Sequence, residues 1–158
     1  MPGPEEIPVT IRGLVPTPTG VGVFLGHASK TIAIFVDQSV GMAITMSLRK
    51  IKPPRPLTHD LVSNIFAGLG VRVLKVVIND LKDDTFFARL FLVQESELGK
   101  SMLEIDARPS DSIAIAVQHQ TPIFVSRHVW DQAQDMTWAL EQAQAKEEKP
   151  EDDSTPDA

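Results

Sequence analysis

The sequence predicts an α+β domain built on one mixed, largely antiparallel β-sheet with about four helices. Strand-like segments come in runs, and strands and helices do not alternate strictly along the chain. The spacing of apolar residues changes between a period of two and a helical period at several points, which separates strands from helices. A length of 158 residues agrees with a single domain.

Each expected element follows from its local pattern. Strands are expected where β-branched and aromatic residues cluster or alternate with polar ones, over residues 7–15, 21–26, 31–36, 71–79, 85–93, 101–106 and 122–125. Helices are expected where apolar residues share one helical face, from Asp37 to about 51, from Thr58 to Leu69, from Pro109 past Val117, and over about 127–144. Gly41 lies inside the first helix, where glycine costs roughly 1 kcal/mol, and therefore indicates a close packing contact.

The net charge of −6 is unevenly distributed along the chain. Residues 146–158 hold six acids and two lysines, which contribute −4 and leave residues 1–145 near neutral. A segment of this composition cannot bury enough apolar surface to offset the entropy of ordering it. We therefore expect a folded domain over 1–145 and a disordered acidic tail over 146–158.

The absence of cysteine excludes thiolate nucleophiles, disulfides, zinc ribbons and iron–sulfur clusters. No apolar run approaches the ~20 residues that a bilayer requires. The first ten residues lack the basic start and apolar core of a signal peptide. We therefore expect no membrane association and a cytoplasmic location.

Two segments carry the residue types from which a site could be built, namely 55–60 (RPLTHD) and 106–111 (DARPSD). In each, an arginine precedes a proline and a carboxylate follows in the first turn of a helix. Proline is well suited to the first helical turn, and the residue before it is held extended. Free amide groups at such a helix start favour anions, including phosphates.

Two interpretations of these segments are open. In the first, Asp60 and Asp111 cap their helices, and Arg108 forms a structural ion pair with one of them. In the second, Asp106 and Asp111, helped by Asp60, bind Mg²⁺ or Mn²⁺ through carboxylate oxygens. In that case arginines hold a phosphate and His59 transfers a proton near neutral pH.

One dense basic stretch lies just before the first of these segments. Arg49, Lys50, Lys52 and Arg55 fall within seven residues that include no acid. The stretch either satisfies the C-terminal end of a helix or contacts a polyanion. For the second case, Lys52 and Arg55 are candidate phosphate contacts.

At these residues the sequence resembles the bifunctional nuclease (BFN) domain family. The resemblance covers about 7–135 and is carried by four stretches, 55–61 (RPLTHDL), 78–88 (IND to FFA), 105–111 (IDARPSD) and 122–125 (PIFV). It implies a compact α+β domain that forms homo-oligomers and acts on DNA and RNA. Arg55, His59, Asp60, Asp106, Arg108 and Asp111 are the matched motif positions.

The combined prediction is a metal-dependent nuclease that hydrolyses phosphodiester bonds of DNA or RNA. His59, Asp60 and Arg108 are its expected catalytic residues, Arg55, Arg108 and Lys52 its expected phosphate contacts, and Asp106 and Asp111 its expected ligands for Mg²⁺ or Mn²⁺. The alternative is a non-catalytic oligomeric module that binds a protein or a small anion. A nucleotide-regulated signalling factor would use the same anion site.

Overall fold

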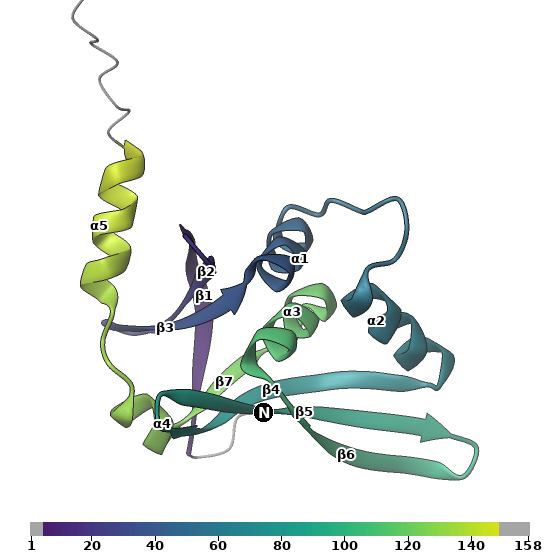
Figure 1. Ribbon diagram of the computed structural model, residues 1–158. Coiled ribbons are helices and arrows are strands. Elements are labelled where there is room, and N and C mark those ends of the chain that lie inside the picture. The colour runs from purple at the N-terminus through teal and green to yellow at the C-terminus, as the bar shows by residue number, and fades with distance from the viewer. Residues whose placement is uncertain (1–4, 149–158) are drawn as a thin grey trace, which may run out of the picture.

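A computed structural model describes residues 5–148 of the chain. Its strands are β1 (Glu6–Thr17), β2 (Gly20–His27), β3 (Lys30–Asp37), β4 (Val71–Lys82), β5 (Thr85–Ser96), β6 (Gly99–Ala107) and β7 (Ile123–Ser126). Its helices are α1 (Gln38–Leu48), α2 (Thr58–Gly68), α3 (Pro109–His119), α4 (Arg127–Gln132) and α5 (Thr137–Glu148). Figure 1 shows their arrangement.

The seven strands form one sheet in the order β3-β2-β1-β7-β4-β5-β6. Every neighbouring pair is antiparallel except β4 and β7, which run parallel. The predicted fold class, α+β with a mixed, largely antiparallel sheet, is therefore confirmed. All seven expected strands are present.

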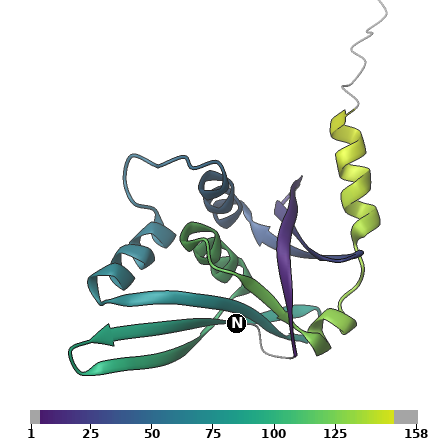
Figure 2. The same cartoon turned by 180° about the vertical axis from the view of Figure 1, so that it is seen from behind.

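Helices α1 and α3 pack between the β1–β3 part of the sheet and the β4–β6 part (Figures 1 and 2). The core beneath them combines fully buried aliphatic side chains of both sheet parts, such as Val23 and Ile78, with those of the two helices, such as Ile44 and Ile113. Gly41 explains how α1 approaches the sheet so closely. A Cβ at this position would lie 2.5 Å from Val21 Cγ2, so a larger residue would push the helix outward.

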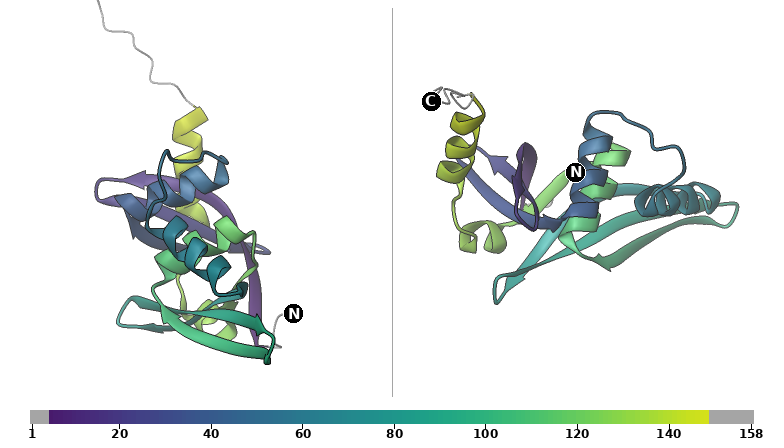
Figure 3. Two further views of the ribbon diagram at one scale, coloured as in Figure 1. Left: turned by 90° about the vertical axis from the view of Figure 1, so that its right-hand side faces the viewer. Right: turned by 45° about the horizontal axis from the view of Figure 1, so that its top comes forward.

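Helix α2 packs on β4 beside α3 and covers the far end of the long strands (Figure 3). Val62 and Phe66 face the core. A second stripe of the helix stays 43–58% exposed, at Leu57, Leu61, Ile65 and Leu69. Helix α2 is therefore apolar on a solvent-facing side as well as on its buried side.

The single helix expected over 127–144 is instead two helices, α4 and α5, separated at residues 133–136. Asp135 starts α5, because its carboxylate accepts hydrogen bonds from the backbone N–H and the hydroxyl of Thr137. Met136 N–H donates to the carbonyl of Thr31 on β3 at 2.7 Å. The interruption thus joins the C-terminal segment to the sheet, a long-range contact that helical periodicity cannot reveal.

Helix α5 continues through Glu148, so residues 146–148 of the expected acidic tail are helical. Residues 149–158 of that tail lie outside the described part of the chain. Within residues 5–148, no helix is both long and apolar enough to cross a membrane.

Candidate active site at the junction of α2 and α3

The two arginine–proline segments both lie at helix starts, as the sequence predicts. Arg108 is the extended residue before α3 (φ −68°, ψ 145°), and Pro109 occupies the first turn of the helix. The other segment, 55–60, reaches α2 through Leu57, which precedes the first helical residue, Thr58. Helices α2 and α3 then pack against each other, which brings together side chains more than 50 residues apart in sequence.

A hydrogen-bonded chain of three side chains joins the start of α2 to the start of α3. Nε of Arg108 donates to Oδ2 of Asp111 at 2.8 Å, and Nε2 of His59 lies 2.9 Å from Oδ1 of the same carboxylate. The exposed fraction of the side chain rises along this hydrogen-bonded chain, from 10% for His59 through 32% for Asp111 to 65% for Arg108. The His59 end of this hydrogen-bonded chain is thus buried, and the Arg108 end faces solvent.

Electrostatic interactions along this hydrogen-bonded chain shift the pKa values of Asp111 and Arg108. Burial raises the pKa of Asp111, but hydrogen bonds from Arg108 and His59 outweigh it, so the pKa lies below its ordinary value. The hydrogen bond from Arg108 to Asp111 in turn raises the pKa of the guanidinium. Because an ionised carboxylate only accepts hydrogen bonds, Nε2 of His59 is the donor in this contact. In the neutral form of an imidazole that carries its proton on Nε2, Nδ1 has the lone pair.

A second hydrogen-bonded network joins α2 to the other end of α3. Oδ2 of Asp60 accepts from the Leu57 N–H at 2.8 Å, and Oδ1 accepts from Nε2 of Gln118 at 2.9 Å. Ser63 donates to Oε1 of Gln118 at 2.8 Å and lies 2.9 Å from Nε2 of His119. Since the one hydroxyl proton of Ser63 is used by Gln118, His119 is the donor to Ser63. Asp60 therefore caps the start of α2, as the first sequence interpretation describes, and it also joins α2 to α3 through Gln118.

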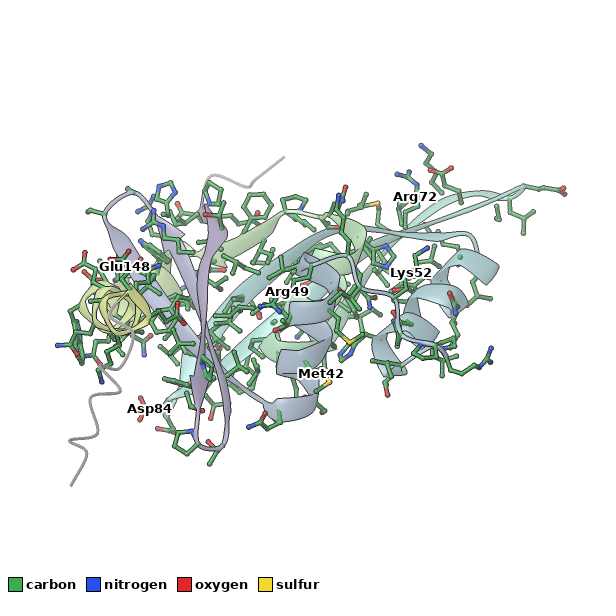
Figure 4. The ribbon with its side chains drawn as sticks, turned by 90° about the horizontal axis from the view of Figure 1, so that it is seen from above. Met42, Arg49, Lys52, Arg72, Asp84 and Glu148 are labelled. Carbon is green, nitrogen blue, oxygen red and sulfur yellow. The ribbon has the colours of Figure 1, made fainter. Side chains whose placement is uncertain are left out.

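The basic stretch is exposed between α1 and α2. Figure 4 shows Arg49 and Lys52 on the side of the molecule that carries the helices. Lys50 and Lys52 line a hollow of about 550 Å³, which is also lined by Asp60, Ser63 and His119. Arg55 is exposed on the same loop, three residues before Thr58. Lys52 and the second network therefore line the same depression.

A much smaller cavity of about 20 Å³ adjoins this hollow and shares Ser47, Asp60 and Gln118 with it. His59 lines the small cavity. Its volume is sufficient for one water molecule, which needs about 10–15 Å³. The buried histidine therefore borders both the carboxylate of Asp111 and a space of the size of one water.

Asp106 lies apart from these residues. It belongs to β6 and is paired with Arg89 of β5, whereas its neighbour Ala107 packs against the core beneath the helices. Because successive strand residues point to opposite faces, Asp106 points away from α3. Asp111, with both oxygens occupied, and Asp106, on the other face, do not fit a shared divalent cation within one chain. Nor does the described part of the chain hold any group of three or more His, Asp or Glu residues arranged for a metal ion.

Sequence reasoning did not include Ser63, Gln118 and His119 in the site. Gln118 and His119 carry no local signal, because their partners on α2 are 55–58 residues away in sequence. The helical spacing of Ser63 from His59 and Asp60 is the one pattern that could have suggested a shared face. Burial lowers the pKa of His119, so this imidazole stays neutral at lower pH than an exposed one.

The bifunctional nuclease domain model matches residues 23–137, which span all the side chains described above. The chain belongs to the bifunctional nuclease domain family. The resemblance found in the two arginine–proline segments is thus confirmed.

Several curated proteins are similar to this chain. An uncharacterized protein of Mycobacterium tuberculosis is 37% identical over 107 residues, which cover 68% of this chain and 61% of that protein. Bifunctional nuclease 1 of Oryza sativa subsp. japonica is 29% identical over 98 residues, covering 62% of this chain and 29% of that protein. Bifunctional nuclease 1 of Arabidopsis thaliana is 27% identical over 100 residues, covering 62% and 30%. The matched region therefore spans about three-tenths to three-fifths of the length of these relatives.

Proposed function

We propose that this protein hydrolyses phosphodiester bonds of nucleic acid at the Arg108–Asp111–His59 chain. Membership of the bifunctional nuclease domain family supports the reaction class. The observation that carries the proposal is that both oxygens of Asp111 connect a buried imidazole to a solvent-facing guanidinium. An acid–base group and a phosphate-binding group are thereby held by one carboxylate.

Arg108 is the proposed phosphate contact. Its contact with Asp111 uses Nε, and its side chain is 65% exposed, so the two Nη groups are available to a ligand. A guanidinium matches the oxygen geometry of a phosphate, and Asp111 holds it in one orientation. The amide groups at the start of α3, an 11-residue helix, add a favourable field for an anion.

His59 is the proposed proton-transfer group. Asp111 holds the proton on Nε2 and stabilises the imidazolium, as in other carboxylate–histidine pairs. Nδ1 is then the basic nitrogen, and the cavity that His59 lines has room for the water that it would deprotonate. Lys52 and Arg55 are proposed to hold a neighbouring phosphate of the same strand, since they are exposed on the adjoining loop.

No step of this mechanism passes through a metal ion, because the described residues do not offer a fitting set of ligands within one chain. The sequence predicts a requirement for Mg²⁺ or Mn²⁺ from Asp106 and Asp111. Cleavage measured with and without these ions tests that requirement. A homo-oligomer is proposed as the active form, since residues 1–145 of a single chain are near neutral and offer one short basic stretch to a polyanion.

The decisive experiment is cleavage of end-labelled DNA and RNA oligonucleotides by the purified full chain, with EDTA, Mg²⁺ or Mn²⁺. We expect cleavage by the wild type and a loss of at least about 100-fold in His59→Gln, the usual contribution of a general acid–base group. His128→Gln is the matched control, because His128 is exposed and lies on α4. Equal rates for the wild type and His59→Gln would assign the cleavage to a contaminant.

A second candidate function is a non-catalytic binding module. It is favoured by one specific observation, namely that Asp60 and Asp111 each have both oxygens bonded within their own chain. Under this alternative, His59→Gln lowers the melting temperature, and no cleavage is detected under any metal condition. Binding of an oligonucleotide without cleavage, measured by fluorescence anisotropy, would then assign the chain to nucleic-acid binding alone.

A further inference from the structure

The two edge strands of the sheet, β3 and β6, differ in whether another segment of the chain covers them. At the β3 edge, the segment between α4 and α5 covers Thr31, whose N–H donates to Asp135 and whose carbonyl accepts from Met136. At the β6 edge, the strand pairs with β5 on one side only. Residues 99–106 of β6 are exposed throughout. One side of β6 thus presents unpaired backbone groups to solvent.

Strand β6 lacks most of the features by which proteins protect such an edge. It contains no proline, and its pairing with β5 runs without a bulge from Ala107 to Gly99. Apolar side chains occur on both of its faces, with Met102 67%, Leu103 38% and Ile105 43% exposed. A regular, partly apolar edge strand of nine residues is a template for a further strand.

We propose that β6 pairs antiparallel with β6 of a second copy of this chain, about a twofold axis at Leu103. The charges along the strand favour this partner. In this register Lys100 of each copy stands opposite Asp106 of the other, and Leu103 stands opposite Leu103. Opposite charges facing each other across strands are stabilising, whereas like charges are destabilising.

Neighbouring registers are less favourable. An axis at Glu104 would place this glutamate against its own copy, and an axis at Ile105 would place Glu104 opposite Asp106. An axis at Met102 would pair Lys100 with Glu104 but would set Asp106 opposite Leu98, beyond the end of the strand. The register at Leu103 is the one that uses the whole of β6 and neutralises the charges at its two ends.

The proposed pairing has a consequence for the candidate active site. Continued by one residue, the same register sets Leu98 of the second copy opposite Arg108. Leu98 is fully exposed at the tip of the β5–β6 hairpin, and Arg108 is the solvent-facing member of the site. The second copy would therefore bound the phosphate-binding end of the site. The pairing itself stands on β6 alone and does not depend on nuclease activity.

The first test is the mass of the full-length chain in solution, measured by sedimentation equilibrium over a range of concentrations. We expect the wild type to dimerise and Leu103→Lys to weaken dimerisation at least about tenfold, because two like charges would meet at the axis. Met42→Lys on α1 is the matched control, since Met42 is 62% exposed and is placed on another element (Figure 4). A wild type that stays monomeric, or a dimer that Leu103→Lys leaves intact, would overturn the proposal.

The second test determines the register by disulfide cross-linking. Because the chain has no cysteine, a single introduced cysteine is the only thiol in each copy. Leu103→Cys should form a disulfide-linked dimer under mild oxidation, because facing residues in antiparallel strands have Cα atoms about 4.5–5.5 Å apart. Trp138→Cys on α5, 55% exposed in the wild type, is the control for random collision and should stay monomeric. Faster linkage through Met102→Cys or Ile105→Cys than through Leu103→Cys would overturn this register.

Discussion

The two connections between α2 and α3 use similar residue types but expose different groups. At the start of α3, Asp111 links buried His59 to Arg108, whose side chain is 65% exposed. At the end of α3, Asp60 is bonded to a backbone amide and to Gln118, which continues to Ser63. The first connection ends at a charged group in solvent, whereas the second carboxylate is satisfied between the two helices. Chemistry toward a ligand is therefore expected at the first, and helix positioning at the second.

The largest expected effect comes from Asp111→Asn. This substitution removes the negative charge that orients Arg108 and holds the proton on Nε2 of His59. We expect the rate of oligonucleotide cleavage to fall about 10²–10⁴-fold, the range of general acid–base catalysis. Initial rates at saturating substrate measure this loss. A residual rate within a few-fold of the wild type would remove the functional distinction between the two connections.

Asp60→Ala tests the other connection. It leaves the Leu57 N–H and the Gln118 amide without their acceptor, so the free energy of unfolding should fall by about 1–3 kcal/mol. The melting temperature should fall by roughly 2–4 °C for each kcal/mol lost. The cleavage rate well below the melting temperature should change by less than about threefold, if the residue acts only in positioning.

The matched control for this change is Asn64→Ala, since Asn64 is exposed on the same helix. Thermal unfolding followed by circular dichroism compares the two variants. A large loss of cleavage rate in correctly folded Asp60→Ala would show instead that both connections contribute to chemistry. Asp60 would then be a catalytic residue, as the sequence predicts.

Lys52→Ala tests whether the hollow beside the second network binds nucleic acid. Each phosphate contact that is lost reduces the slope of log Kobs against log salt by about 0.7–0.9. We expect a reduction of this size for Lys52→Ala and none for Lys82→Ala, whose side chain is exposed and pairs with Asp80. Anisotropy titrations at several salt concentrations give both slopes. Equal slopes for the two variants would place the nucleic acid elsewhere on the surface.

The smallest expected effect concerns His119 and pH. Burial lowers the pKa of His119 below 6.5, so between the folded-state and unfolded-state pKa values the unfolded chain binds more protons. Stability therefore rises with pH across that window and is lost as the pH falls from about 6.5. His119→Gln, which retains a donor for Ser63, should show a shallower dependence of the urea midpoint on pH between about 5 and 7. An unchanged dependence would show that His119 does not titrate differently on folding.

Sequence patterns located every strand and the first three helices, because their period and their caps are local properties. The same reasoning identified His59, Arg108 and Asp111 as candidate site residues, since arginine–proline segments at helix starts are visible in the chain. It grouped Asp106 with Asp111 because they are only five positions apart in the sequence. The structure separates these two, because the end of β6 and the start of α3 direct their side chains differently.

The sequence by itself determined the order of strands and helices, the position of the two charged helix starts and the family of this protein. Such features depend on residues that are neighbours in the chain. The tertiary structure alone decided that His59 meets Asp111 rather than Asp106, that Asp60 meets Gln118, and that β6 stays at an open edge of the sheet. These outcomes depend on how helices pack and strands pair across more than 50 residues, where side-chain direction and burial, rather than sequence distance, choose the partner.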